Sequence, residues 1–207
     1  MTKRPKVSFL VFLFALFCTA QVSAISISFQ LPSTTTNIGD TLDIDIVASG
    51  LFDAGEIVST YDLFVGYDAT IVAVSAISFG PYLDDLLFPS IQFEDTSTPG
   101  ILEFGEISFL FDNELAVIQP ERFTLATLSF DTLSSGVSGL SFEPHPNFGV
   151  IDVKGRNAQI LNLTAGVGFI RVLEPPVSVP EPDSLALMLI GFLLLIISFH
   201  RFSFRTS

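Results

Sequence analysis

The 207-residue sequence predicts an all-β protein, a single antiparallel β-sandwich flanked by an N-terminal signal-peptide helix and a C-terminal transmembrane helix. Three observations predict the sandwich. Residues 25–173 contain many short runs in which apolar and polar residues alternate, as in strands with one buried face. Clusters of Gly, Pro, Asn and Ser separate these runs. No window of ten or more residues in this region keeps the apolar spacing of a helix, and many short strands pack as two facing sheets.

Residues 1–24 have the three parts of a secretory signal peptide. Three basic residues among the first six are followed by the apolar run 7–18. Val22 and Ala24 then stand three and one residues before the predicted cut, where signal peptidase accepts small residues. We expect cleavage after Ala24, with Ala20 as a second option. The alternative is an uncleaved membrane anchor, for which an apolar run of about 12 residues is short.

Residues 25–173 supply strands nearly throughout. In residues 42–46, apolar residues alternate with Asp43 and Asp45, and residues 61–67 alternate in the same way around Asp62. Each strand is therefore predicted to have one buried face and one solvent-exposed face. Within 123–130 the apolar positions shift by one residue, which predicts a β-bulge. Further strands are expected at 71–79, 101–109, 123–130, 137–142, 148–153, 159–163 and 167–172. We assign most of the 14 phenylalanines of the region to one core.

The charge of this region excludes one class of partner. Between residues 25 and 173 the chain has four basic and 19 acidic residues, a net charge of −15. Such a surface repels phosphate backbones, so nucleic acid is not expected as a partner. An anionic polysaccharide would bind only through bridging divalent cations. The single cysteine, Cys18, leaves with the signal peptide, so we expect neither disulfides nor thiolate metal sites in the mature protein.

Groups suited to catalysis are scarce, and we predict no catalytic residue and no cofactor. The one histidine of the region, His145, lies between two prolines and is expected to be exposed. Asp84–Asp85 and Glu94–Asp95 are the candidates for a glycosidase pair, although neighbours in a strand point to opposite faces. Calcium is the metal that suits these acids, but there is no EF-hand pattern and we assign no ligands.

A sugar-binding sandwich needs exposed aromatic rings, and the sequence offers few. It has no tryptophan and three tyrosines. Tyr61 and Tyr67 occupy core-facing positions of their strand. Tyr82 is therefore predicted to be the only exposed platform for a ligand.

The C-terminal part divides into a linker and an apolar helix. Residues 174–183 are proline-rich and extended, and residues 184–207 form a helix with a basic tail. The run 185–199 has no charge and reaches ~22 Å against a ~30 Å hydrocarbon core, so it spans only if Arg201 and Arg205 snorkel. Because basic residues flank the outer side of both apolar segments, both ends belong in the cytoplasm and the sandwich is exported.

This tail closely resembles the PEP-CTERM sorting signal. The matching features, in order, are the motif Val179-Pro180-Glu181-Pro182, the apolar helix, and the basic stop with Arg201 and Arg205. The resemblance implies processing by an exosortase, in a Gram-negative bacterium that makes exopolysaccharide. The protein is then expected as a precursor anchored in the inner membrane, and afterwards at the cell surface or in the extracellular matrix. An ordinary tail anchor is the alternative.

The sandwich itself resembles the cohesin-like domains, nine-stranded jelly rolls related to carbohydrate-binding modules. Three stretches carry the resemblance. Residues 37–44 contain a Gly-Asp strand entry, residues 63–74 a Tyr-Asp pair where one strand ends and the next begins, and residues 165–172 a closing strand with glycines. The resemblance implies a non-catalytic binding module over most of residues 26–172.

These observations lead to a first hypothesis and two alternatives. The first is a non-catalytic surface or biofilm-matrix protein that meets signal peptidase, an exosortase and the membrane during export, and then binds a protein partner or extracellular polysaccharide. One alternative is a small secreted carbohydrate-active enzyme that uses paired carboxylates. The other is a structural matrix protein with no specific ligand.

Overall fold

The computed structural model describes residues 25–175 and 187–194. One compact unit ends at Leu173 and a second begins at Glu174. The predicted signal peptide with its cleavage site at Ala24, the sorting motif at residues 179–182, and Arg201 and Arg205 lie outside the described residues. Of the predicted transmembrane segment, residues 187–194 are described and helical. In the described part of the chain, no helix is both long and apolar enough for a membrane span.

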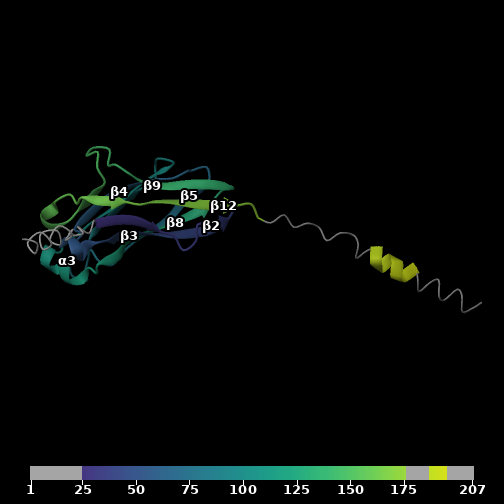
Figure 1. The fold of residues 1–207 in the computed structure, drawn as a ribbon, viewed down its shortest axis with the longest axis horizontal. Helices are drawn as coiled ribbons and strands as arrows, with labels where there is room; N and C mark the ends of the chain where they lie inside the picture. Colours follow the sequence, from purple (N-terminus) through teal and green to yellow (C-terminus); the bar gives the residue numbers. More distant parts are fainter. Residues whose placement is uncertain (1–24, 176–186, 195–207) are drawn as a thin grey trace, which may run out of the picture. The chain divides into compact units, whose positions relative to one another are not determined.

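The sandwich consists of two sheets that face each other (Figure 1). Five strands form one sheet in the order β11-β1-β3-β8-β5, and the order β2-β12-β9-β4-β7-β6, with β10 on β4, forms the seven-stranded sheet. The strands are β1 (Ile25–Gln30), β2 (Thr35–Asn37), β3 (Thr41–Ser49), β4 (Thr60–Gly66), β5 (Val72–Phe79), β6 (Ile91–Asp95), β7 (Ile101–Ile107), β8 (Arg122–Thr132), β9 (Gly136–Glu143), β10 (Asp152–Lys154), β11 (Leu163–Ala165) and β12 (Val167–Leu173).

The predicted sandwich is confirmed, with three corrections. The pairs β1–β11 and β2–β12 are parallel, whereas all other pairs are antiparallel. Short helices, α2 (Leu51–Ala54) and α3 (Asp112–Ile118), and a 3₁₀ turn, η1 (Arg156–Ala158), interrupt the strands. The strand expected at 148–153 is reduced to β10, because residues 144–151 leave the sheet as a loop. The strand expected at 159–163 is reduced to a bridge from Ile160 to Lys154 and to Leu163, which begins β11.

The alternation of side chains builds the core between the sheets. Ile44 and Ile46 of β3 and Leu63 and Val65 of β4 are completely buried, while Asp43 is exposed, as the sequence predicts. The assignment of most phenylalanines to the core is wrong. Four are buried, and six are exposed because loops and outward strand positions carry them. The other four are partly buried, and two of these, Phe29 and Phe79, pack against the core. The buried ones are Phe104, Phe123, Phe130 and Phe142, and the exposed ones are Phe52, Phe88, Phe109, Phe111, Phe148 and Phe169.

The predicted β-bulge is confirmed in β8. Ile46 pairs with Ala126 and the next residue of β3, Val47, pairs with Thr124, so Leu125 is the extra residue. Both Leu125 and Ala126 are completely buried. The bulge therefore lets two consecutive residues of one strand face the core.

The side chain of Glu106 places a carboxylate inside the core. The carboxylate of Glu106 is buried and accepts hydrogen bonds from Ser90, from Gln92 at 3.0 Å and from the Tyr61 hydroxyl at 3.2 Å. The same hydroxyl donates to the Leu125 carbonyl at 3.0 Å. Burial and the neighbouring carboxylate raise the pKa of the Tyr61 phenol, so this group stays a donor. The network ties β4 to β6, β7 and the bulge of β8.

Replacing Tyr61 with Phe should destabilise the sandwich by about 1–3 kcal/mol, because it leaves one oxygen of buried Glu106 without its donor, while the Leu125 carbonyl keeps the Gly80 N–H. Urea unfolding followed by circular dichroism measures the loss. Tyr67→Phe is the matched control, since the Tyr67 ring packs on Phe130 and only a half-buried hydroxyl is removed. Equal losses in the two variants would contradict this role of the network.

Candidate functional site

The outer face of the five-stranded sheet is uniformly polar. None of the large apolar residues in its five strands is exposed. Carboxylates pair with hydroxyls across β3 and β8, where Thr41 donates to Asp131 at 2.7 Å and Ser129 donates to Asp43 at 2.6 Å. Asp45 accepts from Thr127 in the same way. The three carboxylates accept hydrogen bonds from hydroxyls of the neighbouring strand. This face is therefore hydrated and presents little apolar surface to a partner.

The outer face of the seven-stranded sheet is different, and we call it the binding face. It combines exposed apolar side chains with an open groove and a loop that crosses the sheet. We define it by the outward residues Ile101 of β7, Val137 of β9, and Val167 and Phe169 of β12, together with Phe148 of the loop. Clustered apolar residues at the surface of a monomer mark an interaction site.

The loop exists because β9 and β10 share one edge of β4. β9 pairs with residues 64–66 of β4, and β10 pairs with residues 60–62. Residues 144–151 leave the sheet between these two strands. The loop is closed by hydrogen bonds from the His145 N–H to the Val150 carbonyl, and from Phe148 and Gly149 N–H to the His145 carbonyl. It therefore has a defined conformation, which holds Phe148 outward.

His145 fastens this loop to the sheet, and the prediction that it is exposed is wrong. Only 7% of the residue is accessible, and its Nε2 lies 3.3 Å from Asp62 Oδ2. Its Nδ1 accepts the Asn147 N–H at 3.0 Å, so the proton of the neutral ring is on Nε2 and points to the carboxylate. The ring also stacks on Phe148 and meets Phe64 edge-on. The half-buried carboxylate of Asp62 therefore has a hydrogen-bond donor beside it.

Two carboxylates lie side by side under the loop. Asp62 and Asp152 are directly paired across β4 and β10, and Lys154 Nζ lies 3.2 Å from Asp152 Oδ2. Among the described residues, Oδ1 of each aspartate is buried and has no hydrogen-bond partner. Burial, and then the charge of Asp152, raises the pKa of Asp62, while His145 and Lys154 act in the opposite direction. Burial, with Asp62 and Asp95, also raises the pKa of Glu103.

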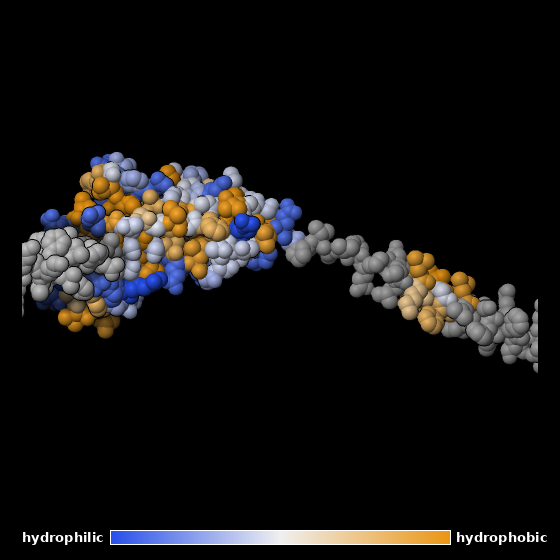
Figure 2. Space-filling view, in the orientation of Figure 1, coloured by the Kyte–Doolittle hydropathy of each residue, from blue (hydrophilic) through white to orange (hydrophobic). Residues whose placement is uncertain are grey.

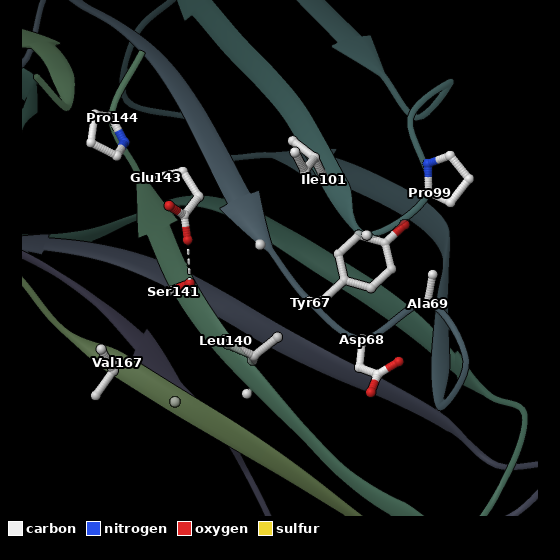
Figure 3. A pocket seen from close by; sticks show the side chains of 14 residues that line it. Tyr67, Asp68, Ala69, Pro99, Ile101, Leu140, Ser141, Glu143, Pro144 and Val167 are labelled. Atoms are coloured by element: carbon white, nitrogen blue, oxygen red, sulfur yellow. Dashed lines mark hydrogen bonds between the residues drawn. The ribbon is translucent and has the colours of Figure 1, made fainter. Parts of the chain in front are cut away.

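The groove lies where β4 ends, beside β9 and β12. It has a volume of about 930 Å³. In Figure 3, Glu143 and Pro144 lie on the opposite side of it from Tyr67 and Pro99. A Cβ on Gly66 would lie 3.0 Å from Glu143 Oε1, so the glycine leaves space at the bottom of the groove. The wide and open shape suits a protein segment better than a small substrate.

The carboxylates proposed for catalysis are not brought together. Asp85 accepts the N–H groups of Leu87 and Phe88, and Asp95 accepts that of Ser97, so both stabilise turns. The groove has its own acids, Asp68 and Glu143. Hydrogen bonds from Thr70 lower the pKa of Asp68, whereas a general acid needs a raised pKa. Glu143 accepts the Ser141 hydroxyl at 2.6 Å.

Tyr82, the predicted ligand platform, is less exposed than expected. Tyr82 is half-buried, its ring packs against Phe123 at 5.2 Å and its carbonyl accepts a hydrogen bond from Gln119, so it is not the freely exposed ring that was predicted. In the described ranges, no three His, Cys, Asp or Glu side chains are grouped to hold a metal ion. The contact between His145 and Asp62 was not predicted. Its only signals in the sequence are Asp62 at an outward-facing strand position and a histidine between two prolines.

Replacing Asp62 with Asn should stabilise the sandwich increasingly as the pH rises from about 4, the ordinary pKa of Asp, through the raised pKa of Asp62. The raised pKa of Asp62 means that the folded state favours its protonated form, so the cost of ionising it grows with pH, while Asn stays neutral and still accepts the His145 N–H. Urea unfolding at a series of pH values measures this. Asp68→Asn should show the opposite trend, with most of its change below about pH 4, because the pKa of Asp68 is lowered below that of the unfolded chain. A difference in the free energy of unfolding between Asp62→Asn and the wild type that does not grow with pH would contradict this explanation.

Comparison with solved structures finds cohesin modules. A type II cohesin domain from the cellulosome of Acetivibrio cellulolyticus gives a TM-score of 0.60 at 18% identity, covering 71% of this chain and 95% of that one. The sixth cohesin of scaffoldin B from the same organism, solved with a Cel5 dockerin, gives 0.55 at 15% identity, with 72% and 99% covered. A non-cellulosomal cohesin from Archaeoglobus fulgidus gives 0.54 at 10% identity, with 72% and 91% covered.

Neither a protein-family model nor a curated protein matches the chain. At identities of 10–18% the similarity to the solved cohesins concerns the fold. The expectation drawn from the three sequence stretches is confirmed at that level. The chain has a cohesin-like β-sandwich.

Proposed function

We propose that this protein is a non-catalytic binding module that is exported and attaches to a protein partner through the binding face. The observation that carries the proposal is the contrast between the two outer faces. On one face, carboxylates and hydroxyls form hydrogen bonds with one another. The other face exposes Phe148, Val167 and Phe169 and has a groove, which Val167 lines. An apolar patch with a polar rim is the usual anatomy of a protein interface.

The contacts that His145 makes with Asp62 and Phe148 prepare this face for binding. Because His145 holds Phe148 in place from below, the exposed ring loses little conformational entropy when a partner covers it. Asp68, Glu103 and Glu143 at the rim favour a partner that brings Lys or Arg to the edge of the contact. The solved structures of similar fold support a protein partner, since a cohesin from scaffoldin B was crystallised with a dockerin.

A polysaccharide ligand is less well supported. The chain has no tryptophan, and the ring of Tyr82 is partly covered by Phe123. A net charge of −15 between residues 25 and 173 opposes contact with an acidic polymer unless divalent cations bridge the two. The enzyme alternative has no support in the groove, where the carboxylates stabilise turns and strands.

We infer from the C-terminal sequence that the module is delivered by a sorting system of the exosortase type. The order of motif, apolar helix and basic stop supports this, and the helix at 187–194 carries apolar side chains that are all exposed within the chain. A helix that is apolar on every side requires a nonaqueous environment. The precursor would then be held in the inner membrane before the module reaches the cell surface or the matrix.

Val167→Asp should weaken partner binding at least tenfold, because it places a charge in the apolar centre of the binding face, where Val167 is 82% exposed and no folding contact is lost. Immobilised residues 25–175 capture exported proteins, and calorimetry with the identified partner then gives Kd. Ser78→Asp adds the same carboxylate to an exposed strand position on the other sheet and should leave Kd unchanged.

Two outcomes would contradict the proposed face. One is a partner that binds Val167→Asp and the wild type equally well. The other is a partner whose binding is lost in Ser78→Asp. Failure to capture any partner would favour the structural matrix protein.

Changing Pro180-Glu181-Pro182 to three alanines should leave the protein unprocessed in the inner membrane, because the enzyme would lose its motif while the apolar segment remains. Fractionation and immunoblotting of a tagged protein measure this. Replacing Pro175 and Pro176, which lie in the same linker, with alanines is the control and should not affect processing. Normal release of the first variant would contradict the exosortase assignment.

A further inference from the structure

The sandwich has a second concentration of exposed apolar residues, at the end where the chain crosses between sheets. α2 joins β3 to β4, and α3 joins β7 to β8. Ser49 of β3 pairs with Arg122 of β8, and Thr60 of β4 pairs with Ile107 of β7, so both helices lie at the same end. Figure 2 shows hydrophobic side chains at the end that carries α3 in Figure 1.

We call this region the crossover surface and define it by Phe52 of α2, Phe111 before α3, and Val117 and Ile118 of α3. All four side chains are exposed, and Val117 is 85% accessible. The groove and loop of the binding face come from other segments of the chain. The crossover surface is therefore a separate site.

A cavity of about 190 Å³ opens between the two helices. Leu51 and Ile57 are buried and form its apolar part, while Phe52 and Ala116 lie at its exposed side. The rest of the cavity is lined by Gly55, Glu56, Gln119 and Arg156. Apolar cavities of about 150 Å³ in proteins bind a molecule as large as benzene. The cavity thus has room for one aliphatic or aromatic side chain from outside.

The walls of this cavity are fixed before anything binds. The buried side chain of Gln119 donates to the Val58 carbonyl at 2.6 Å and to the Tyr82 carbonyl at 3.1 Å, and it accepts the Val58 N–H at 2.9 Å. At the other end of α3, Glu114 accepts the Phe111 N–H at 2.8 Å. A partner therefore meets a preorganised site, which lowers the entropic cost of docking.

The negative charge at this end of the sandwich determines which kind of partner can bind there. In the segments 50–59 and 108–121, which contain the two helices at this end, the chain has five acidic residues and no Lys or Arg. Asp53, Glu56 and Glu114 belong to the segments that form the crossover surface. The one basic residue at the cavity, Arg156, donates from Nε to the Gly55 carbonyl at 2.8 Å. A second copy would bring the same acids against these, and an anionic membrane would be repelled, so the occupant must be cationic.

We propose that the crossover surface docks a cationic amphipathic helix of a protein partner. One apolar side chain of that helix fills the cavity, its apolar face covers Phe52, Phe111 and Val117, and its Lys or Arg residues meet the acids around them. This is the helix-in-groove mode of recognition. It gives the module two independent contact surfaces, so a module held by the binding face still has a free end for a second partner.

The test uses residues 25–175, because the core clusters consist only of side chains within this range. The probe is a fluorescein-labelled peptide of about 18 residues with Leu at helical spacing and Lys elsewhere, long enough to form a helix. Fluorescence anisotropy should show saturable binding. A peptide with Glu in place of Lys should not bind.

Two variants locate the peptide. Val117→Ser should weaken binding at least tenfold, and Ala116→Phe, which fills the cavity from the helix, should do the same. Val167→Ser is the matched control, since it makes the same change at an equally exposed position, 82% accessible, of the binding face, and it should leave Kd unchanged. Circular dichroism checks that Ala116→Phe is folded, and the exposed position of Val117 keeps the first variant informative in any case.

Three results would overturn the proposal. Binding that survives both Val117→Ser and Ala116→Phe would mean general attraction of Lys to an acidic protein. Equal losses in Val117→Ser and Val167→Ser would place the peptide on the binding face. Dimerisation in ultracentrifugation, or binding to phosphatidylcholine vesicles, that is lost in Val117→Ser would assign the crossover surface to another occupant. Failure of the partner capture with Val167→Asp leaves this test unaffected.

Discussion

The structure depends on β4, which lies inside the seven-stranded sheet and pairs with β7, β9 and β10. Its inward residues Tyr61, Leu63 and Val65 are fully buried between the sheets. Its outward residues Asp62, Phe64 and Gly66 form the base of the binding face. Because one edge of β4 is shared by two strands, the loop between them must rise over the sheet. The same strand thus fixes the core and positions the loop that holds Phe148.

The charges and apolar residues of the sandwich are divided among its surfaces. The carboxylates of the five-stranded sheet are paired with hydroxyls across β3 and β8, which keeps that face hydrated. The binding face and the crossover surface carry the exposed Phe, Val and Ile side chains among other acids. Net negative charge of this kind opposes self-association by repulsion, and it favours partners that bring positive charge to an apolar contact.

Local patterns in the sequence predict much of this fold, and pairings between distant residues account for what they miss. The alternation around Asp43 and Asp62 and the phase shift near Leu125 are local, and the structure confirms them. The burial of His145 depends on β10 pairing with β4, which no local pattern reports. The ring of Tyr82 is covered by Phe123 for the same kind of reason. Short or polar strands such as β2 and β6 have little apolar alternation, so the sequence does not reveal them.

The most direct test of the central claim is nuclear magnetic resonance mapping of residues 25–175 titrated with the captured partner. If the seven-stranded sheet carries the contact, shifts should concentrate at Phe148, Val167, Phe169 and the groove residue Ser141. The signals of Asp43 and Ser129 on the other sheet should stay in place. Shifts that concentrate around Asp43 and Ser129, with Phe148 and Val167 unchanged, would contradict the account.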